Sequence, residues 1–506
     1  MSEHLRCIGN AESVPLASLP LLDLSTFRAE LLTQIAGGLR LACFCADAGL
    51  DAYAVLADDG EQHLHVLRTR LSDRYPALTL DCSQAHLFER EIAEQFDVRP
   101  VGHPWLKPVR GQKPWRGGDG VFAEVSDLPA VIDFYKIVGD EVHEVAVGPV
   151  HAGVIEPGHF RFQCLGEEVM HLEIALGYQH RGIEQALIGG PYPRSFKHIE
   201  TIAGDTSIGH GTAYCRVLES LGGCSVSWRA ELMRAMALEL ERLANHTGDL
   251  GAIAGDVGFL PTASFCGRIR GDWLNLSAVL CGSRLGRDFL KPGGVRWDLE
   301  ATRLMDCAQR IETAWTDTAD AIELLWSTPS VMARLEGTGN IKTQQAIDIG
   351  LVGVAMRACG AHRDVRQDFP WGAWCQRGYK AQTSDNETST GDVYARARVR
   401  WLEMGESVAF LRWACTQLAD CAGQAIAAPV GPLAADHLCV SLCEGWRGEI
   451  LHLAITDGAG RFRRYKIVDP SFHNWFGLAL ALRGEQISDF PLCNKSFNLS
   501  YCGFDL

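Results

Sequence analysis

Two neighbouring segments carry most of the information in this sequence: Val147-Gly-Pro-Val-His-Ala-Gly-Val-Ile-Glu-Pro-Gly-His-Phe-Arg-Phe162 and Gly177-Tyr-Gln-His-Arg-Gly-Ile-Glu184. The first places His151, Glu156 and His159 among glycines and prolines, and the residues that follow alternate as in a strand. This pattern predicts a tight polar loop between strands. Such loops often carry function, so we expect a site here. The alternative is a Gly/Pro turn whose histidines face water.

Length, composition and charge restrict the class of protein. The chain has 506 residues, enough for two or three domains with sizeable cores, and 47% of them are hydrophobic. Its formal net charge of −15 argues against nucleic acid as a partner. No signal-like start is present, and no segment approaches the ~20 apolar residues of a membrane span. We therefore expect a soluble, cytoplasmic chain that reaches a membrane only through other subunits.

Eighteen cysteines are scattered through this large chain, which predicts reduced thiols rather than a disulfide framework. The close pairs Cys43/Cys45 and Cys439/Cys443 lie in strand-like runs, where the members of each pair share a face. One pair cannot supply the four ligands of a cluster or a structural zinc. Core packing is therefore favoured over metal binding at both pairs.

The spacing of apolar residues predicts an α+β protein with two domains, 1–135 and 136–506. In the first, a small α/β domain, helical spacing covers 22–38 and 87–96, and strand-like runs cover 41–56 and 63–71. A linker rich in Gly and Pro follows at 111–120. In the second domain, helical spacing predicts a bundle of long helices at 228–250, 299–325, 343–359 and 394–426. Peripheral strands are predicted at 440–453 and 463–468, as a hairpin around Asp457-Gly-Ala-Gly460.

Further motifs follow in a fixed order along the chain: Glu239-Leu-Glu-Arg-Leu-Ala-Asn-His246, Gly282-Ser-Arg284 with Pro292-Gly-Gly-Val295, Gly391-Asp-Val-Tyr-Ala-Arg396, and Glu444-Gly-Trp-Arg-Gly-Glu449. Together with the opening segments, they resemble the large subunit of energy-converting [NiFe]-hydrogenases and formate hydrogenlyase. More distantly, they are similar to the quinone-site subunit of respiratory complex I, an NADH-quinone oxidoreductase. The resemblance runs nearly end to end and implies the fold of the hydrogenase large subunit for 136–506.

The N-terminal domain carries its own resemblance. Glu89-Arg-Glu-Ile-Ala-Glu-Gln-Phe96 followed by Gly102-His-Pro-Trp105 resembles the small hydrophilic subunit of complex I, which some relatives carry fused ahead of the large one. The resemblance implies an assembly role without redox chemistry. The alternative for Glu89–Glu94 is a solvated helix face.

The resemblance also implies which metal chemistry is lost. In [NiFe]-hydrogenases four thiolates from two Cys-x-x-Cys pairs hold the nickel. The first pair falls at Ala203 and Thr206, and from the second only Cys502, or Cys493, survives. We therefore expect the NiFe centre to be absent, which makes an active hydrogenase the least favoured function.

The quinone site of the complex I relatives is also altered. Its two headgroup contacts fall at Ile155 and Gly204, whereas a neighbouring histidine is retained as His151. Glu156 stands where the hydrogenase relatives carry a proton-transfer glutamate. We assign no catalytic base. The candidates for the wall of the cavity are His151, Glu156, His159, Asp205, His210 and Arg447.

Arg181 is the candidate for contact with a cofactor of another subunit. In complex I the arginine of the Arg-Gly-x-Glu motif lies against the terminal [4Fe-4S] cluster of the iron–sulfur subunit, and a cation there raises the reduction potential of the cluster. A companion histidine falls at Gly286. The alternative for Arg181 is a surface salt bridge with Glu184 or Glu173.

A row of polar residues on the helix at 228–250 allows two interpretations. Glu241, Asn245 and Asp249 share one helix face, and Arg242 and His246 form the adjacent row. They could form a buried ion-pair network, or they could line the cavity and a proton route, as the resemblance implies.

These observations favour the large subunit of a membrane-bound, complex I-like oxidoreductase that has lost its nickel site. Electrons would pass from a partner's [4Fe-4S] cluster to an acceptor, with a quinone as one candidate. Integral-membrane subunits at the inner face of the cytoplasmic membrane would couple this reaction to ion translocation. The alternative is a redox-silent scaffold subunit of an ion-translocating assembly.

Overall fold

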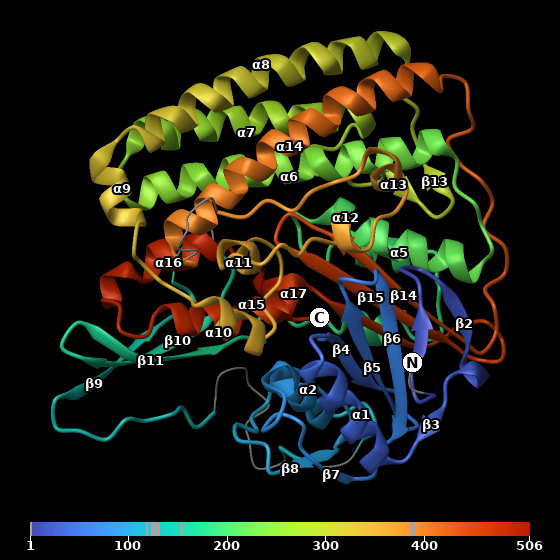
Figure 1. Cartoon of the computed structure of the whole chain (residues 1–506), viewed down its shortest axis with the longest axis vertical. Coiled ribbons are helices and arrows are strands. Elements are labelled where there is room, and N and C mark those ends of the chain that lie inside the picture. The colour runs from blue at the N-terminus through green and yellow to red at the C-terminus, as the bar shows by residue number, and fades with distance from the viewer. Residues whose placement is uncertain (1–2, 118–119, 123–131, 152–154, 385–389) are drawn as a thin grey trace.

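The computed structural model describes residues 3–117, 120–122, 132–151, 155–384 and 390–506. Long helices stack above several sheets, and a smaller sheet projects to one side (Figure 1). The chain therefore mixes helices and sheets, as the sequence predicts. The domain boundary at residue 135 stays a prediction.

The N-terminal segment forms a five-stranded sheet of order β1–β6–β5–β4, with β3 beside β6. The run 41–56 divides into two strands because Asp47 accepts hydrogen bonds from the N–H groups of Gly49 and Asp51 and closes a turn. The elements of this segment are β1 (Arg6–Ile8), β3 (Leu21–Leu22), α1 (Leu24–Ala36), β4 (Arg40–Ala46), β5 (Asp51–Asp58), β6 (His63–Arg70), β7 (Arg74–Pro76), α2 (His86–Phe96) and β8 (Arg99–Val101).

Helix α2 is charged but buried. Glu89, Glu91 and Glu94 are 0%, 1% and 2% exposed, so the alternative of a solvated helix face is wrong. Glu89 accepts hydrogen bonds from Thr79, and Glu91 forms an ion pair with Lys466, 375 positions away in the sequence. A buried carboxylate is stable only when it is paired or hydrogen-bonded. Helix α2 thus docks the N-terminal segment onto the rest of the chain.

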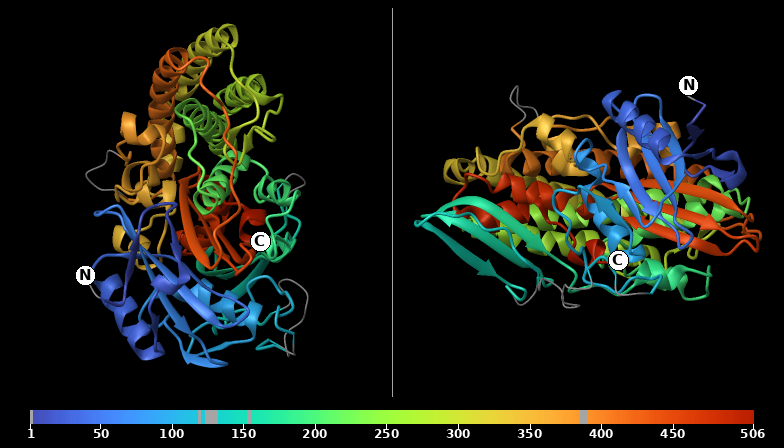
Figure 2. Two further views of the ribbon diagram at one scale, coloured as in Figure 1. Left: turned by 90° about the vertical axis from the view of Figure 1, so that its right-hand side faces the viewer. Right: turned by 90° about the horizontal axis from the view of Figure 1, so that it is seen from below.

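The C-terminal sheet has the order β16–β15–β14–β2, and its edge strand β2 (Ser13–Pro15) comes from the N-terminal segment. Its other strands are β14 (His437–Glu444), β15 (Glu449–Thr456) and β16 (Phe462–Val468). The run 440–453, predicted as one strand, is divided by a turn in which Gly445 and Gly448 exchange backbone hydrogen bonds. The hairpin around 457–460 is confirmed. In Figure 2 this sheet lies between the N-terminal sheet and the long helices.

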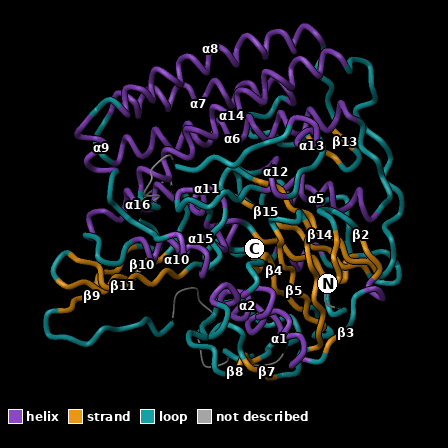
Figure 3. The backbone as a smooth tube through the Cα atoms, in the orientation of Figure 1, coloured by secondary structure: helices purple, strands orange, loops and turns teal. Residues whose placement is uncertain are grey.

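Four long helices form the bundle: α6 (Trp228–Asp256), α7 (Leu260–Cys281), α8 (Ala301–Trp326) and α14 (Val393–Asp420). Three of them were predicted. In Figure 3 these long helices occupy the upper part of the molecule and most strands the lower part. Within the described ranges, none of the helices combines the length and the apolar composition that a membrane crossing requires.

The predicted helix at 343–359 is two short helices, α10 (Thr343–Asp348) and α11 (Gly353–Ala358). The break is caused by Gly350 and Gly353, which both adopt positive φ. A side chain on Gly353 would lie 2.2 Å from the carbonyl oxygen of Arg447, so this glycine lets the chain approach the turn between β14 and β15.

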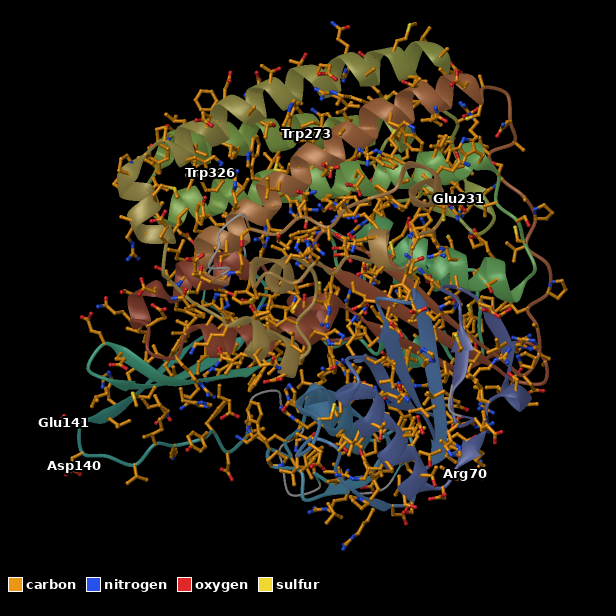
Figure 4. The ribbon with its side chains drawn as sticks, viewed as in Figure 1. Arg70, Asp140, Glu141, Glu231, Trp273 and Trp326 are labelled. Carbon is orange, nitrogen blue, oxygen red and sulfur yellow. The ribbon has the colours of Figure 1, made fainter. Side chains whose placement is uncertain are left out.

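Both ends of the segment 147–162 lie in strands of the projecting sheet, whose order is β11–β10–β9. The predicted loop lies between β9 (Val142–Val147) and β10 (His159–Leu165), and β11 (Glu168–Ala175) follows; positions 152–154 of the loop lie outside the described residues. Asp140 and Glu141 lie at the outer end of this arm, whereas Trp273 lies within the bundle (Figure 4).

Shorter elements complete the chain. They are α3 (Ile183–Leu187), α4 (Ser195–Ile199), α5 (Ser207–Leu221), β12 (Leu290–Lys291), β13 (Gly294–Val295), α9 (Pro329–Leu335), α12 (Val365–Asp368), α13 (Ala373–Arg377), α15 (Pro470–Ala481), α16 (Phe490–Phe497) and α17 (Tyr501–Phe504).

Candidate functional site

The loop after β9 packs against the C-terminal helix α17. Glu156 Oε2 accepts hydrogen bonds from the backbone N–H groups of Tyr501 and Cys502, at 3.3 and 3.5 Å. The Tyr501 hydroxyl lies 3.3 Å from Nε2 of His151. A side chain at Gly158 would lie 2.5 Å from the Tyr501 ring, so glycine is required for this close packing. The structure therefore brings His151 and Glu156 together on the C-terminal segment.

Asp205 and Arg447 form the second part of the site. Two nitrogens of the Arg447 guanidinium donate to the two carboxylate oxygens of Asp205, at 2.7 and 2.8 Å. Burial opposes ionisation, but the charge of Arg447 and its hydrogen bonds hold the pKa of Asp205 below its ordinary value. Trp446 donates its indole N–H to the backbone oxygen of Asp205, and its ring lies 3.9 Å from the Arg447 guanidinium.

The C-terminal segment joins these two groups. Arg447 Nε donates to the backbone oxygen of Asn498 at 2.5 Å, and Glu156 accepts from Tyr501 and Cys502 in the same segment. The site is thus built from four regions far apart in the sequence: the loop before β10, the start of α5, the turn between β14 and β15, and the C-terminal segment.

Two of the six candidates lie apart from the groups around Glu156 and the Asp205–Arg447 ion pair. Among the described residues, His159 contacts Gly148, Arg161 and Phe134 and none of the other candidates. His210 is fully buried beneath the site, where its two ring nitrogens lie near His452 and Asp469. His210 therefore lies in the interior of the protein.

Arg181 is exposed, and backbone carbonyl groups hold its guanidinium. It donates to the oxygens of Thr201 and Ile202 at 2.6 and 3.0 Å, and to that of Cys502 at 3.4 Å. The alternative of a salt bridge is wrong, because Glu173 pairs with Lys107 and Glu184 pairs with Lys466 and Arg464. Within the described part of the chain, the charge of Arg181 has no carboxylate partner.

The donor set does not fit a nickel centre. Arg181 binds the carbonyl groups of both Ile202 and Cys502, so it is Cys502, not Cys493, that the fold brings beside Ala203. Burial and the neighbouring Glu156 raise the pKa of the Cys502 thiol to about 12, and this single thiol is fewer than the four thiolates that hold nickel. Thr206 uses its hydroxyl oxygen to accept from Trp446 and Arg447. Across the described ranges, no group of three or more His, Cys, Asp or Glu side chains could hold a metal ion.

Of the two polar rows of α6, one contacts the site and the other forms a buried ion-pair network. Glu241 accepts from the N–H groups of Ile208 and Gly209 at the start of α5, and Asn245 donates to the backbone oxygen of Asp205. This face of α6 therefore holds the start of α5 and the backbone of Asp205 in place. The adjacent row is an interior ion-pair network, in which Arg242 and His246 both contact Glu403. The other members of this network are Glu239, Arg357, Asp364, Arg366 and Glu444.

Sequence reasoning missed His452, Tyr465 and Asp469. The motif Asp469-Pro470-Ser471 is typical of a helix start and was available as a signal, and Asp469 is indeed the N-cap of α15. Nothing local indicated its histidine partner, because His210 lies 259 positions earlier.

Comparisons with known proteins agree with this architecture. Residues 256–430 match the family described as the respiratory-chain NADH dehydrogenase 49 Kd subunit. A carbon monoxide-induced hydrogenase of Rhodospirillum rubrum is 30% identical over 359 residues, which cover 70% of this chain and 97% of the relative. Formate hydrogenlyase subunit 5 of Escherichia coli (strain K12) is 28% identical over 456 residues, with 84% and 76% covered. NADH-quinone oxidoreductase subunit 4 of Thermus thermophilus is 29% identical over 394 residues, with 73% and 95% covered.

The long-helix bundle and these matches define a subunit of the complex I and hydrogenase type. The chain belongs to the family that unites the 49 Kd subunit of NADH dehydrogenase with the large subunits of energy-converting hydrogenases. The resemblance inferred from the sequence motifs is confirmed.

Proposed function

We propose that this chain is the large subunit of a membrane-bound, complex I-like oxidoreductase that lacks a nickel centre. Electrons arrive from a [4Fe-4S] cluster of an iron–sulfur partner subunit and reduce an acceptor, with a quinone as a candidate, at the site around Asp205 and Arg447. The reaction is coupled to ion translocation by integral-membrane subunits, through which the chain attaches to the inner face of the cytoplasmic membrane. Residues 1–135 serve as the assembly domain of the complex.

The observation that carries this proposal is the state of Arg181. Its guanidinium is exposed, rigidly held by backbone carbonyl groups, and not neutralised by a carboxylate among the described residues. Because the same guanidinium contacts Ile202 and Cys502, its charge lies beside the altered metal positions. An uncompensated cation at this place suits a docked redox centre whose reduced state is the more negative one.

The polar groups of the site support chemistry at an acceptor. Arg447 supplies a fixed positive charge, and Asp205, which is half-buried, supplies a carboxylate. Glu156 and His151 lie across the C-terminal segment from them. These groups can bind an acceptor by hydrogen bonds and hold protons near it, although Ile155 and Gly204 replace the headgroup contacts of the complex I relatives.

The test is Arg181→Met in the assembled complex, read by potentiometric titration with electron paramagnetic resonance. Removing the cation destabilises the reduced cluster, so the midpoint potential should fall by roughly tens of millivolts without loss of assembly. The matched control is Arg412→Met on α14, which makes the same charge change at an exposed pair with Glu312 on α8. An unchanged potential with Arg181→Met in an intact complex would rule out the contact.

A redox-silent scaffold is the second candidate. The loss of the thiol positions at Ala203 and Thr206 and of the headgroup contacts at Ile155 and Gly204 favours it. In that case the intact complex would contain no reducible cluster beside this subunit, and the same titration would show it.

A further inference from the structure

Beneath the site runs a line of four fully buried polar side chains, here called the tetrad: Tyr465 on β16, His452 on β15, His210 on α5 and Asp469 at the start of α15. The Tyr465 hydroxyl lies 2.9 Å from His452 Nδ1. His452 Nε2 lies 3.1 Å from His210 Nδ1, and His210 Nε2 lies 3.0 Å from Asp469 Oδ2. Each imidazole nitrogen in the line therefore has one partner inside the tetrad.

The chemistry of the end group decides where the protons are. An ionised Asp469 can only accept, so His210 must carry its proton on Nε2 and accept at Nδ1. His452 must then donate from Nε2 and accept at Nδ1, and Tyr465 must donate its hydroxyl proton. All the hydrogen bonds thus point the same way, from Tyr465 towards Asp469. The second oxygen of Asp469 is occupied, because it accepts from the N–H group of Ser471 at 2.8 Å.

The two ends of the line differ in their surroundings. The Asp469 end faces the site: a side chain on Gly503 would lie 2.6 Å from Asp469 Oδ2, so this glycine lets the C-terminal segment approach. Cys502 in that segment contacts Glu156. At the other end, the ring of Tyr465 packs 5.8 Å from that of Tyr214.

We infer that the tetrad is a proton relay that takes up one proton at Tyr465 and holds it beside Asp469, under the site. When a proton binds the Tyr465 oxygen, the phenol proton moves to His452 Nδ1. The proton on His452 Nε2 then moves to His210 Nδ1. Each O–H or N–H bond that breaks is replaced by one that forms, and no electron moves. The product is an imidazolium at His210 paired with the Asp469 carboxylate.

The electrostatics favour the positive charge of the added proton at His210, beside Asp469, over His452. Burial lowers the pKa of His452 well below its ordinary value, so His452 passes the proton on and does not keep it. Burial opposes ionisation of Asp469, but the hydrogen bond from His210 keeps the pKa of this carboxyl low. The other titratable or charged groups that face the tetrad are Arg447, Glu184, Tyr214, Cys215, Cys439 and His473. That the stored proton serves an acceptor in the site rests on the proposed function, whereas the relay is a property of this chain alone.

The relay is tested in the full-length chain with ¹⁵N-labelled histidine, by following the imidazole nitrogen resonances as the pH is lowered. His210→Gln and His452→Gln assign the signals. We expect the proton of His452 to move from Nε2 to Nδ1 in the same step in which His210 gains its second proton. If the two rings change separately, or if neither changes while the chain stays folded, the tetrad is a static polar network and the inference is wrong.

Two variants separate a relay from a structural role. Asp469→Asn keeps an acceptor for His210 but removes the charge, so the coupled step should move to lower pH by about one to three pH units. Asp392→Asn is the matched control, because Asp392 is also a buried N-cap aspartate and has no imidazole partner. Tyr465→Phe keeps the ring but removes the entry oxygen, and it should abolish the tautomer change at His452 while leaving the fold intact. An unchanged coupled step in Asp469→Asn or Tyr465→Phe would also refute the relay.

Discussion

Arg447 and Asp205 lie 242 positions apart in the sequence, yet they form a two-point ion pair at 2.7 and 2.8 Å. The pair fastens the turn between β14 and β15 to the start of α5. A third hydrogen bond, from Arg447 Nε to the backbone oxygen of Asn498, adds the C-terminal segment. One guanidinium thus holds together three of the regions that form the site.

Arg447→Lys should destabilise the chain, because an ammonium group cannot reproduce the planar fork that serves Asp205 and Asn498 together. We expect the free energy of unfolding in urea to fall by about 1.5–3 kcal/mol. The control is Arg412→Lys, which alters another bidentate ion pair, that between Arg412 and Glu312. The two side chains of this pair are 49% and 54% exposed. That change should cost less than about 1 kcal/mol. Equal losses in both variants would contradict the structural role of Arg447.

Glu241 should be protonated at neutral pH. Burial raises its pKa to about 8 from an ordinary value of 4.5, and the hydrogen bonds from Ile208 and Gly209 only partly oppose this. Because the fold favours the neutral form, the stability that Glu241 contributes is present below pH 4.5 and is lost as the pH rises through about 8.

Infrared difference spectra between pH ~6.5 and ~9.5 should therefore show a carboxylic acid band that disappears with a midpoint near 8. Glu241→Gln should lack the component with a midpoint near 8, whereas Glu444, whose pKa burial raises to about 7, should keep its own component. The exposed Glu312→Gln should keep both components, because its hydrogen bonds with Arg412 lower the pKa of Glu312. A component near 8 that persists in Glu241→Gln would assign this titration to another group.

The purified complex should contain no stoichiometric nickel. Ala203 and Thr206 supply no thiolates, and the buried Cys502 alone cannot hold a soft metal. Elemental analysis decides the question. Nickel near one atom per chain, together with hydrogen-dependent dye reduction, would overturn the argument from the ligands.

The chain should fractionate with membranes only when its partner subunits are present. None of its described helices suits a membrane crossing, and the proposed function attaches the chain through integral-membrane subunits. The chain is expressed with and without the partners, and the fraction that sediments with membranes at high salt is measured. Retention of the isolated chain on membranes would contradict the proposed mode of attachment.

Local sequence was sufficient for the family, the mixed class of the fold and most long elements. Helix α6 could be predicted because its apolar residues recur at the helical period, and the missing nickel ligands could be identified because a thiolate has no substitute among Ala and Thr side chains. Predictions were wrong where glycines with positive φ interrupt the pattern, as at Gly353 and Gly448. Apolar spacing is the same on both sides of such a turn, so the pattern does not reveal it.

Tertiary structure alone decided which charges are buried and what they contact. The carboxylates of α2 have the spacing of a solvated face, but Lys466 lies against Glu91 and makes its burial stable. In the same way, His210 became one member of a line that ends at Asp469 only when the sheet and α15 closed around it. The physical reason is that the free energy of a charged side chain depends on the partner that folding brings to it, and that partner is far away in the sequence.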